Sequence, residues 1–224
     1  MAMGLMAKTH HENFSFDLRF GIIKGGEATY NAKDTLIDGK RKIFTTLHAY
    51  TTGFANLLYG VNDSFESVVQ PVTLLPVSST KQLHEKDYRF SEHILFNHET
   101  NMVYSNRNGW HQVEAGICDV STMIYHLRFS GKLNALKKGQ IIEIPFWDTN
   151  EWYMLSMKYM GVETVKTRLG SFSCMRLEPM QVSGRFFNKK NPINIWISND
   201  YRKLPVLMEL NFTIGSVRCE LNKI

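Results

Sequence analysis

One stretch of the chain decides the fold, and it reads Cys118-Asp119-Val120-Ser121-Thr122-Met123-Ile124-Tyr125-His126-Leu127-Arg128-Phe129. Its apolar residues follow the spacing of a helix with one buried stripe, at Val120, Met123, Ile124 and Leu127. Asp119 can cap the free backbone N–H groups of the first turn, where its charge suits the helix dipole. Ser121 lies in that same turn, where serine is common because its hydroxyl can take part in capping. Gly131 can end the helix. We therefore expect one main α-helix near residues 119–129.

The sequence on both sides of this helix alternates between apolar and polar residues, which indicates strands with one buried face. The clearest alternating runs are Phe14–Ile22, Ile193–Ile197, Val206–Phe212 and Val217–Leu221. Turn signals recur about every 8–12 residues, for example at Asp38-Gly39 and Asp148-Thr149-Asn150, as is typical of an antiparallel roll or barrel. The pattern predicts a mainly β protein, in which a curled antiparallel sheet (a β-roll or open barrel) packs on the helix.

Glycines suggest where several strands begin and end. Gly25-Gly26 is expected to form the turn that ends the first strand. Gly161 is expected to separate two long strands, Trp152–Met160 and Val162–Arg168. The short apolar piece Gly53–Tyr59 fits either a single helical turn or a strand bulge, and the sequence leaves both open.

The composition is that of an ordinary globular domain rich in strands. Of 224 residues, 43% are hydrophobic, 21% are charged and 12% are aromatic. The net charge of +5 invites a nucleic-acid interpretation, but the cations form short clusters beside turn residues, at Lys40–Lys42, Lys137–Lys138 and Lys189–Lys190. We expect these clusters to be solvated turns, with no nucleic acid as a partner.

No apolar run approaches the ~20 residues that a membrane-spanning helix needs. Residues 1–13 lack the hydrophobic core of a signal peptide and are interpreted as a leader remnant or a non-native start, followed by a single domain over residues 14–224. The three cysteines, Cys118, Cys174 and Cys219, have no C-x-x-C spacing. We interpret Cys174 and Cys219 as small buried hydrophobic residues. The sequence does not decide whether one disulfide forms in an oxidising compartment.

Several sequence blocks together resemble a known family. The blocks are Asp63–Ser67, Thr73–Pro76, Asp119–Arg128, Gly170–Pro179, Ile195–Asp200 with Arg202, Leu204–Val206, Ile214–Val217 and Glu220–Leu221. In this order and spacing the chain, from Phe14 to Leu221, resembles the bacterial family known as domain of unknown function 3108, which is met often in Bacteroidetes.

The resemblance implies an exported protein, located in the periplasm or cell envelope, built as an all-β roll or open barrel with a packed helix. It implies no reaction, and it carries over no catalytic motif. On this basis we expect a periplasmic or envelope protein whose signal peptide has been removed. A cytoplasmic location is the alternative.

Candidate metal ligands and catalytic groups lack the spacing that their chemistry requires. The histidines and neighbouring acids are His10-His11-Glu12, His84-Glu85, His93, His98-Glu99 and His111. They show no helical i, i+4 pairing of the kind that binds zinc. There is no G-x-S-x-G elbow, and Gly21–Gly26 lacks the spacing of a phosphate loop. We expect no metal, no cofactor and no catalytic residue, so the protein is not expected to be an enzyme.

The most distinctive polar and aromatic group surrounds Trp196. Asn199-Asp200 is expected to form the turn between two core strands, with Pro205 starting the second, so that Asp200 and Pro205 have structural roles. The functional alternative is that four side chains gather at one mouth of the roll and hold a ligand. These are Tyr125, Arg128, Trp196 and Arg202.

Three classes of function remain open. The first is a non-catalytic envelope protein whose curled sheet binds an apolar or lipid-like molecule, and it predicts a continuous apolar cleft between helix and sheet. The second is a structural or protein-interaction module of the envelope, which would carry an exposed apolar patch or a paired edge strand. The third is a hydrolase with a site that the sequence does not reveal. The sequence does not determine the oligomeric state.

Overall fold

The computed structural model describes residues 11–180, 193–212 and 215–224. The first strand begins at His11, so residues 11–13 belong to the sheet. Two sequence interpretations, the leader over residues 1–10 and the solvated turn at Lys189–Lys190, lie outside the described residues.

The described chain consists of fourteen strands and two helices. In chain order they are β1 (His11–Phe20), β2 (Ile23–Ile37), β3 (Lys40–Thr51), α1 (Gly53–Leu58), β4 (Asn62–Val69), β5 (Pro76–Glu85), β6 (Tyr88–Asn97), β7 (Met102–Ser105), β8 (Gly109–Gln112), α2 (Val120–Phe129), β9 (Ile141–Asp148), β10 (Glu151–Thr167), β11 (Gly170–Pro179), β12 (Ile193–Ser198), β13 (Pro205–Phe212) and β14 (Gly215–Lys223). The mainly β class with one principal helix is confirmed.

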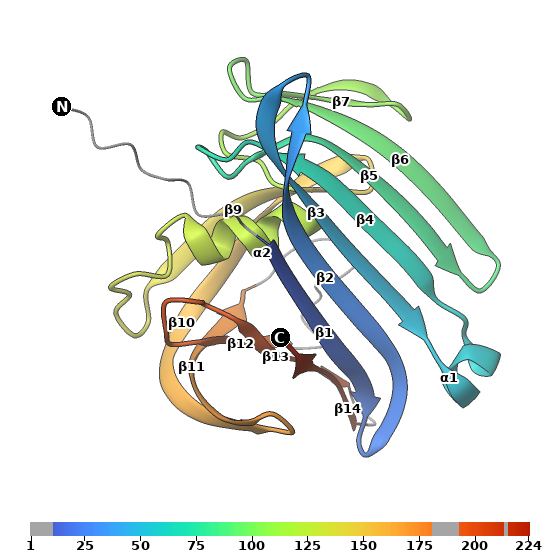
Figure 1. Ribbon diagram of the computed structural model, residues 1–224, viewed down its shortest axis with the longest axis vertical. Coiled ribbons are helices and arrows are strands. Elements are labelled where there is room, and N and C mark those ends of the chain that lie inside the picture. Colours follow the sequence, from blue (N-terminus) through green and yellow to red (C-terminus); the bar gives the residue numbers. More distant parts are fainter. Residues whose placement is uncertain (1–10, 181–192, 213–214) are drawn as a thin grey trace.

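All fourteen strands form one antiparallel sheet in the order β8-β7-β6-β5-β4-β3-β2-β1-β14-β13-β12-β11-β10-β9. Neighbours in the sheet are neighbours in sequence, except where β1 pairs with β14 and joins the two halves. The sheet curls strongly, so that α2 lies inside the curve while α1 lies at the far end of the strands (Figure 1). No ladder joins the edge strands β8 and β9 among the described strands, and the barrel is therefore open.

The helix α2 packs against strands on more than one side, so its most buried residues differ from the apolar stripe that the sequence predicts. Tyr125 belongs to a core cluster with β1, β2, β13 and β14, whereas Leu127 belongs to a second cluster with β9 to β12. The expected single apolar stripe is wrong in part, because three of its four residues are only partly buried. The helix residues that are buried are Ser121, Thr122, Tyr125, Leu127 and Arg128.

The two edges of the sheet are brought together by side chains, in a contact that we call the seam. Trp147 of β9 packs in one cluster with Ile94, Phe96 and Val103 of β6 and β7. Its indole nitrogen donates to Glu92 Oε1 at 3.1 Å. Next to it, the ammonium group of Lys81 on β5 forms a buried ion pair with Asp148 of β9. The seam therefore closes the curve through packing and charge rather than through strand pairing.

The outer edge of β9 is partly covered by the segment that leads into α2. Cys118 N donates to Pro145 O at 2.9 Å, and Trp147 N donates to Cys118 O at 2.7 Å. This short parallel bridge satisfies backbone groups that an edge strand would otherwise expose. It also fixes the point at which α2 starts.

Two of the turns expected at glycines are wrong. The β1–β2 turn lies at Gly21-Ile22, and Gly26 is inside β2, where a Cβ atom would lie 2.5 Å from Tyr50 O. Gly161 does not separate two strands, because β10 runs through it with a bulge and a φ of 111°. In both cases the glycine permits a backbone approach or conformation inside a strand rather than a turn between strands.

Other local predictions agree with the structure. Asp38 and Gly39 both have positive φ in the β2–β3 turn, and the open question at Gly53–Tyr59 is resolved as a short helix. The three cysteines are unbonded, with Cys174 buried and Cys219 partly buried. Burial raises the pKa of the Cys174 thiol to about 11. Neither helix in the described ranges is long and apolar enough to span a membrane.

The seam predicts a specific pattern of stability. In Asp148→Ala the buried Lys81 ammonium loses its carboxylate, and we expect the free energy of unfolding to fall by about 3–5 kcal/mol. Replacing both partners, as Lys81→Met with Asp148→Ala, removes the unpaired charge and should restore most of that loss. Urea unfolding measures both variants.

A half-exposed ion pair is the matched control. Glu209 lies 3.5 Å from Arg218 on neighbouring strands β13 and β14. Glu209→Ala should cost at most about 1 kcal/mol, as is usual for solvated ion pairs. Equal losses in the single and the double seam variants would contradict a buried charge pair at the seam.

Candidate functional site

The Arg128 side chain is buried, and its guanidinium forms hydrogen bonds within the protein. Its guanidinium donates to both carboxylate oxygens of Glu12, at 2.7 and 2.9 Å, and to the carbonyl oxygens of Arg202 and Lys203. It also lies over the rings of Phe14 and Phe129. With only 4% of the residue exposed, these contacts join α2 to β1 and to the β12–β13 turn.

The other three side chains predicted to hold a ligand lie nearby but do not form an open mouth. Tyr125 and Trp196 belong to one core cluster, and the Trp196 indole donates to Glu163. The Arg202 guanidinium binds Asp200, at 3.0 and 2.6 Å, rather than turning toward the helix. The four residues are thus brought into one region by packing, and a ligand role for them stays a prediction.

The β12–β13 turn is organised by Asp200. Its carboxylate accepts from Ser198 Oγ and from the backbone and side chain of Arg202. Burial tends to raise the pKa of Asp200, but these hydrogen bonds outweigh it and hold the pKa below its ordinary value. Pro205 begins β13 opposite Ile197.

A buried polar network surrounds the first turn of α2. Asp119 Oδ1 accepts from the backbone N–H groups of Ser121 and Thr122, and Asp119 Oδ2 accepts from Ser67 Oγ at 2.6 Å. Ser121 Oγ lies 2.7 Å from Ser67 Oγ and 3.1 Å from Thr45 Oγ1. Burial raises the pKa of Asp119, although hydrogen bonds from Ser67 and Thr122 act in the opposite direction. The network fixes α2 to β3 and β4.

The space beside this network is small. A cavity of about 10 Å³ lies between α2, β4, β5 and β9, and its lining includes Ser67, Lys81, Asp119 and Trp147. This volume has room for about one water molecule. Beside this network, the described residues therefore do not form the continuous apolar cleft that was predicted between helix and sheet.

The candidate metal ligands are dispersed over the sheet. His93 Nδ1 meets Thr80, His98 Nε2 meets Pro76 O, and the His111 ring packs against Trp147. Glu12 is bound to Arg128. Within the described part of the chain, His, Cys, Asp and Glu side chains form no group of three that could hold a metal ion.

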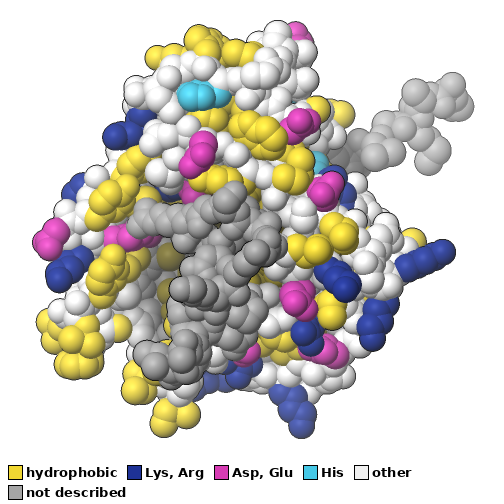
Figure 2. Space-filling view, turned by 180° about the vertical axis from the view of Figure 1, so that it is seen from behind, with side chains coloured by type: hydrophobic (Ala, Val, Ile, Leu, Met, Phe, Trp, Pro, Cys, Tyr) yellow, Lys and Arg dark blue, Asp and Glu magenta, His cyan; other side chains and the backbone are white. Residues whose placement is uncertain are grey.

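Exposed apolar side chains gather at the end of the sheet where the β1–β2 turn and α1 lie. We call this surface the apolar end, and it consists of Phe20, Ile22, Ile23, Phe54, Leu57 and Leu58. The two parts touch, because Thr52 N donates to Gly25 O at 2.8 Å just before α1. Seen from behind, hydrophobic side chains protrude at the lower left and at the foot of the molecule (Figure 2).

A hollow of about 330 Å³ lies next to the apolar end, between α1 and the β5–β6 turn. Its base includes Gly60 and Val61, which pair with the turn through Lys86 N donating to Gly60 O and through the bridge from Val61 to Glu85. The hollow is thus built on backbone hydrogen bonds between two segments of the chain.

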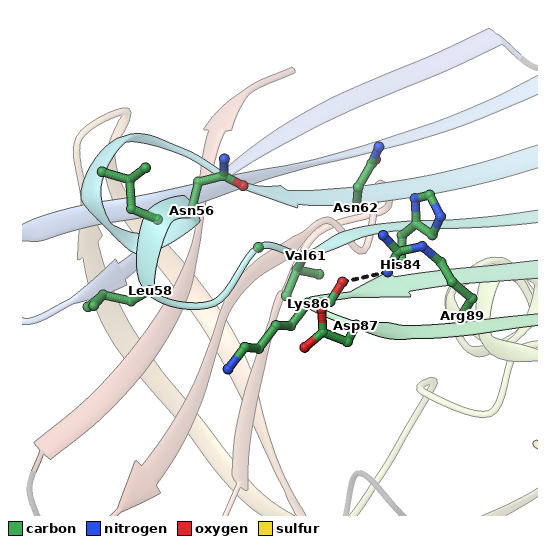
Figure 3. A pocket seen from close by; sticks show the side chains of 10 residues that line it. Asn56, Leu58, Val61, Asn62, His84, Lys86, Asp87 and Arg89 are labelled. Atoms are coloured by element: carbon green, nitrogen blue, oxygen red, sulfur yellow. Dashed lines mark hydrogen bonds between the residues drawn. The ribbon is translucent and has the colours of Figure 1, made fainter.

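The walls of the hollow differ in chemistry. Asn56, Leu57 and Leu58 line the α1 side. The opposite side is lined by His84, Lys86, Asp87 and Arg89. Figure 3 shows the Arg89 side chain folded back so that its guanidinium meets the carbonyl oxygen of Lys86. One wall is therefore largely apolar, and the other carries two cations beside one carboxylate.

Sequence reasoning did not identify this hollow. The signal was present in Gly53–Tyr59, a run of exposed apolar residues between polar neighbours, and in the cations of Lys86–Arg89. What the sequence does not show is that these two segments, nearly thirty residues apart, face one another across Val61.

The fold defines a mainly β, barrel-like protein whose larger described hollow lies at one end of the sheet. The chain belongs to a family described as "Protein of unknown function (DUF3108)", whose sequence profile matches residues 15–222. The suspected family is thereby confirmed. No curated protein matches the sequence.

Solved structures support the fold alone. A β-barrel-like protein of domain of unknown function DUF1849 from Brucella abortus aligns with a TM-score of 0.62 at 10% identity, over 95% of this chain and 96% of that chain. A DUF1089 family protein from Pseudomonas aeruginosa aligns over 97% of this chain and 92% of that chain at 10% identity, but its TM-score of 0.25 carries no argument.

The network around Asp119 predicts a large effect of truncation. Asp119→Ala removes the helix cap and leaves the hydroxyls of Ser67 and Thr122 without their acceptor, so the free energy of unfolding should fall by about 2–4 kcal/mol. Ser130 is the control at the other end of α2, because its buried hydroxyl has no hydrogen-bond partner among the described residues. Ser130→Ala should stay within about 0.5 kcal/mol of the wild type. Similar losses in both variants, measured by urea unfolding, would contradict this assignment.

The raised pKa of Asp119 also predicts a pH dependence. Because the folded-state pKa lies above the ordinary value of 3.8, the native state binds more protons between the two values. The contribution of this carboxyl to stability therefore falls as the pH rises through that window. Asp119→Asn lacks this contribution, so its stability deficit relative to wild type should shrink as the pH rises. A deficit that grows with pH, in unfolding curves across the same range, would contradict the raised pKa.

Proposed function

We propose that this protein is a non-catalytic binding protein of the bacterial cell envelope, and that it holds a lipid-like amphiphile in the hollow beside α1. The observation that carries the proposal is the pairing of an apolar wall, Leu57 and Leu58, with a wall on which two cations, Lys86 and Arg89, outnumber one carboxylate, Asp87. An anionic head would meet the cations while a short apolar chain lies along the leucines.

The sizes of the two cavities favour this location over the interior. Small-molecule sites occupy about 300–1,000 Å³, and the hollow of about 330 Å³ falls at the lower end of that range. The cavity beside α2, at about 10 Å³, has no room for an alkyl chain. The proposed ligand is therefore a head group with part of its chain, held at the end of the sheet rather than within its curve.

The envelope location is part of the proposal, and it is supported by the resemblance of the chain to exported members of its family. A periplasmic or envelope-bound protein would meet lipid-like molecules where they are abundant. Fractionation of the native bacterium, with an antibody against the chain, tests it. Recovery in the periplasmic or membrane fraction supports the proposal, and recovery with cytoplasmic markers contradicts it.

Ligand binding is tested with dodecanoate below its micelle concentration, by isothermal titration calorimetry. The double variant Lys86→Ala with Arg89→Ala should bind at least about tenfold more weakly, because charge-assisted contacts to the head are lost. Lys40→Ala with Lys42→Ala removes the same charge at the opposite end of the sheet and should bind as the wild type does. Dodecanol, which lacks the carboxylate, should bind more weakly than dodecanoate to the wild type.

Two results would overturn the assignment of the hollow. One is dodecanoate affinity that is the same in the Lys86/Arg89 variant and in the wild type. The other is equal loss of affinity in the Lys40/Lys42 control, which would show a general effect of net charge.

A further inference from the structure

The apolar end exposes large hydrophobic side chains, and most of them do not line the hollow. Ile22 at the β1–β2 turn is 93% exposed, Leu57 is 81% exposed and Phe54 is 73% exposed. The helix α1 contains no buried residue. Side chains of this kind cost free energy in water, and a solvated turn or helix has no folding reason to carry them.

Four of the six side chains, Phe20, Ile22, Ile23 and Phe54, protrude without lining the hollow. The β1–β2 turn contributes Phe20, Ile22 and Ile23 from the tip of a hairpin, and α1 contributes Phe54 from the connection between β3 and β4. The β1–β2 turn and α1 lie at the lower end of the molecule in Figure 1, and hydrophobic side chains protrude from this end in the view from behind (Figure 2). A protein partner would need a matching recess, whereas a fluid lipid surface adapts to protruding side chains.

Cations bracket this surface. Arg19 and Lys24 stand immediately on either side of Phe20–Ile23 in sequence, and Arg19 NH1 donates to Ile22 O at 3.0 Å, which holds the guanidinium at the turn. Arg19 is paired with Asp17 and its side chain is only 11% exposed, so Lys24, with 33% of its side chain exposed, is the more accessible cation. The acids that pair with Lys24, Asp17 and Glu27, lie further from the turn along β1 and β2. Apolar residues flanked by Lys and Arg are the pattern of segments that settle at an anionic bilayer interface.

We propose that the apolar end docks on the surface of an anionic phospholipid bilayer, with the β1–β2 turn and α1 inserted among the head groups. Lys24 then faces lipid phosphates, while Phe20, Ile22, Ile23 and Phe54 enter the acyl boundary. Docking requires no ligand in the hollow. If the proposed function also holds, the hollow opens beside the membrane, and the amphiphile passes to it from the bilayer.

The test is co-sedimentation with vesicles of phosphatidylethanolamine containing a minority of phosphatidylglycerol. The wild type should bind, and it should bind less at high salt and to pure phosphatidylcholine vesicles, because part of the attraction is electrostatic. Ile22→Ser with Ile23→Ser should lower the vesicle affinity by roughly tenfold for each side chain removed. Both residues are exposed, so the urea midpoint should not change.

The matched control removes exposed apolar residues from the opposite end of the sheet. Leu36 and Val72 are 74% and 89% exposed, near the β2–β3 and β4–β5 turns. Leu36→Ser with Val72→Ser should bind vesicles as the wild type does. Dodecanoate titration of the Ile22/Ile23 variant should also be unchanged, since neither residue lines the hollow.

Several outcomes would overturn the docking proposal. They are a wild type that does not sediment with anionic vesicles, an Ile22/Ile23 variant that binds them normally, and a Leu36/Val72 control that loses binding equally. Light scattering adds one more, a wild-type dimer that the Ile22/Ile23 variant converts to a monomer, because the occupant would then be a second copy of the chain. Vesicle binding without dodecanoate binding would support docking while rejecting the proposed function, and the reverse result would reject docking alone.

Discussion

The architecture depends on how a fourteen-stranded sheet deals with its two edges. Each edge strand carries backbone N–H and C=O groups that invite pairing with another chain. Here β8 and β9 do not pair with one another in the described structure, yet β9 is covered on its outer side by Cys118 and held from within by the contacts of Trp147 and Asp148. The seam allows the sheet to curl around α2 while the barrel stays open.

This closure explains why the interior beside α2 is unsuited to a large ligand. Next to the seam strand β5, β4 delivers Ser67 to the first turn of the helix, where hydroxyls and Asp119 form a buried network. Polar groups in a network of this kind specify one arrangement, because each would be costly to leave unpaired. Of the two cavities described, the larger lies at the end of the sheet, beside α1 and the β5–β6 turn.

The features that the sequence predicted correctly are those that short segments determine. The cap at Asp119, the turn at Asp38-Gly39 and the helix near residues 119–129 follow from local backbone chemistry. The two glycine turns were wrong because Gly26 and Gly161 serve an approach and a bulge that only the neighbouring strand reveals. Pairing of β1 with β14 likewise depends on strands about two hundred residues apart, which periodicity cannot connect.

The candidate site shows the same limit. Arg128 looked free to bind a ligand in sequence, but Glu12 and the β12–β13 turn occupy its guanidinium in the fold. Conversely, the leucines of α1 were visible as an apolar run, but only the fold shows that Lys86, Asp87 and Arg89 lie opposite them in the lining of one hollow. In both cases burial and contacts with residues distant in sequence determine the surroundings of the side chain, and the local spacing of residues does not reveal them.

The closure of the β9 edge can be measured directly through hydrogen–deuterium exchange of the Trp147 backbone amide. This amide belongs to an edge strand, and its hydrogen-bond acceptor is the carbonyl oxygen of Cys118. If Cys118 covers the β9 edge as described, exchange should be slower than in an unstructured peptide by at least about a thousandfold, as for amides that open only with a large part of the domain. Exchange at the unstructured rate, while amides of the β2–β3 ladder stay protected, would contradict a β9 edge covered by Cys118.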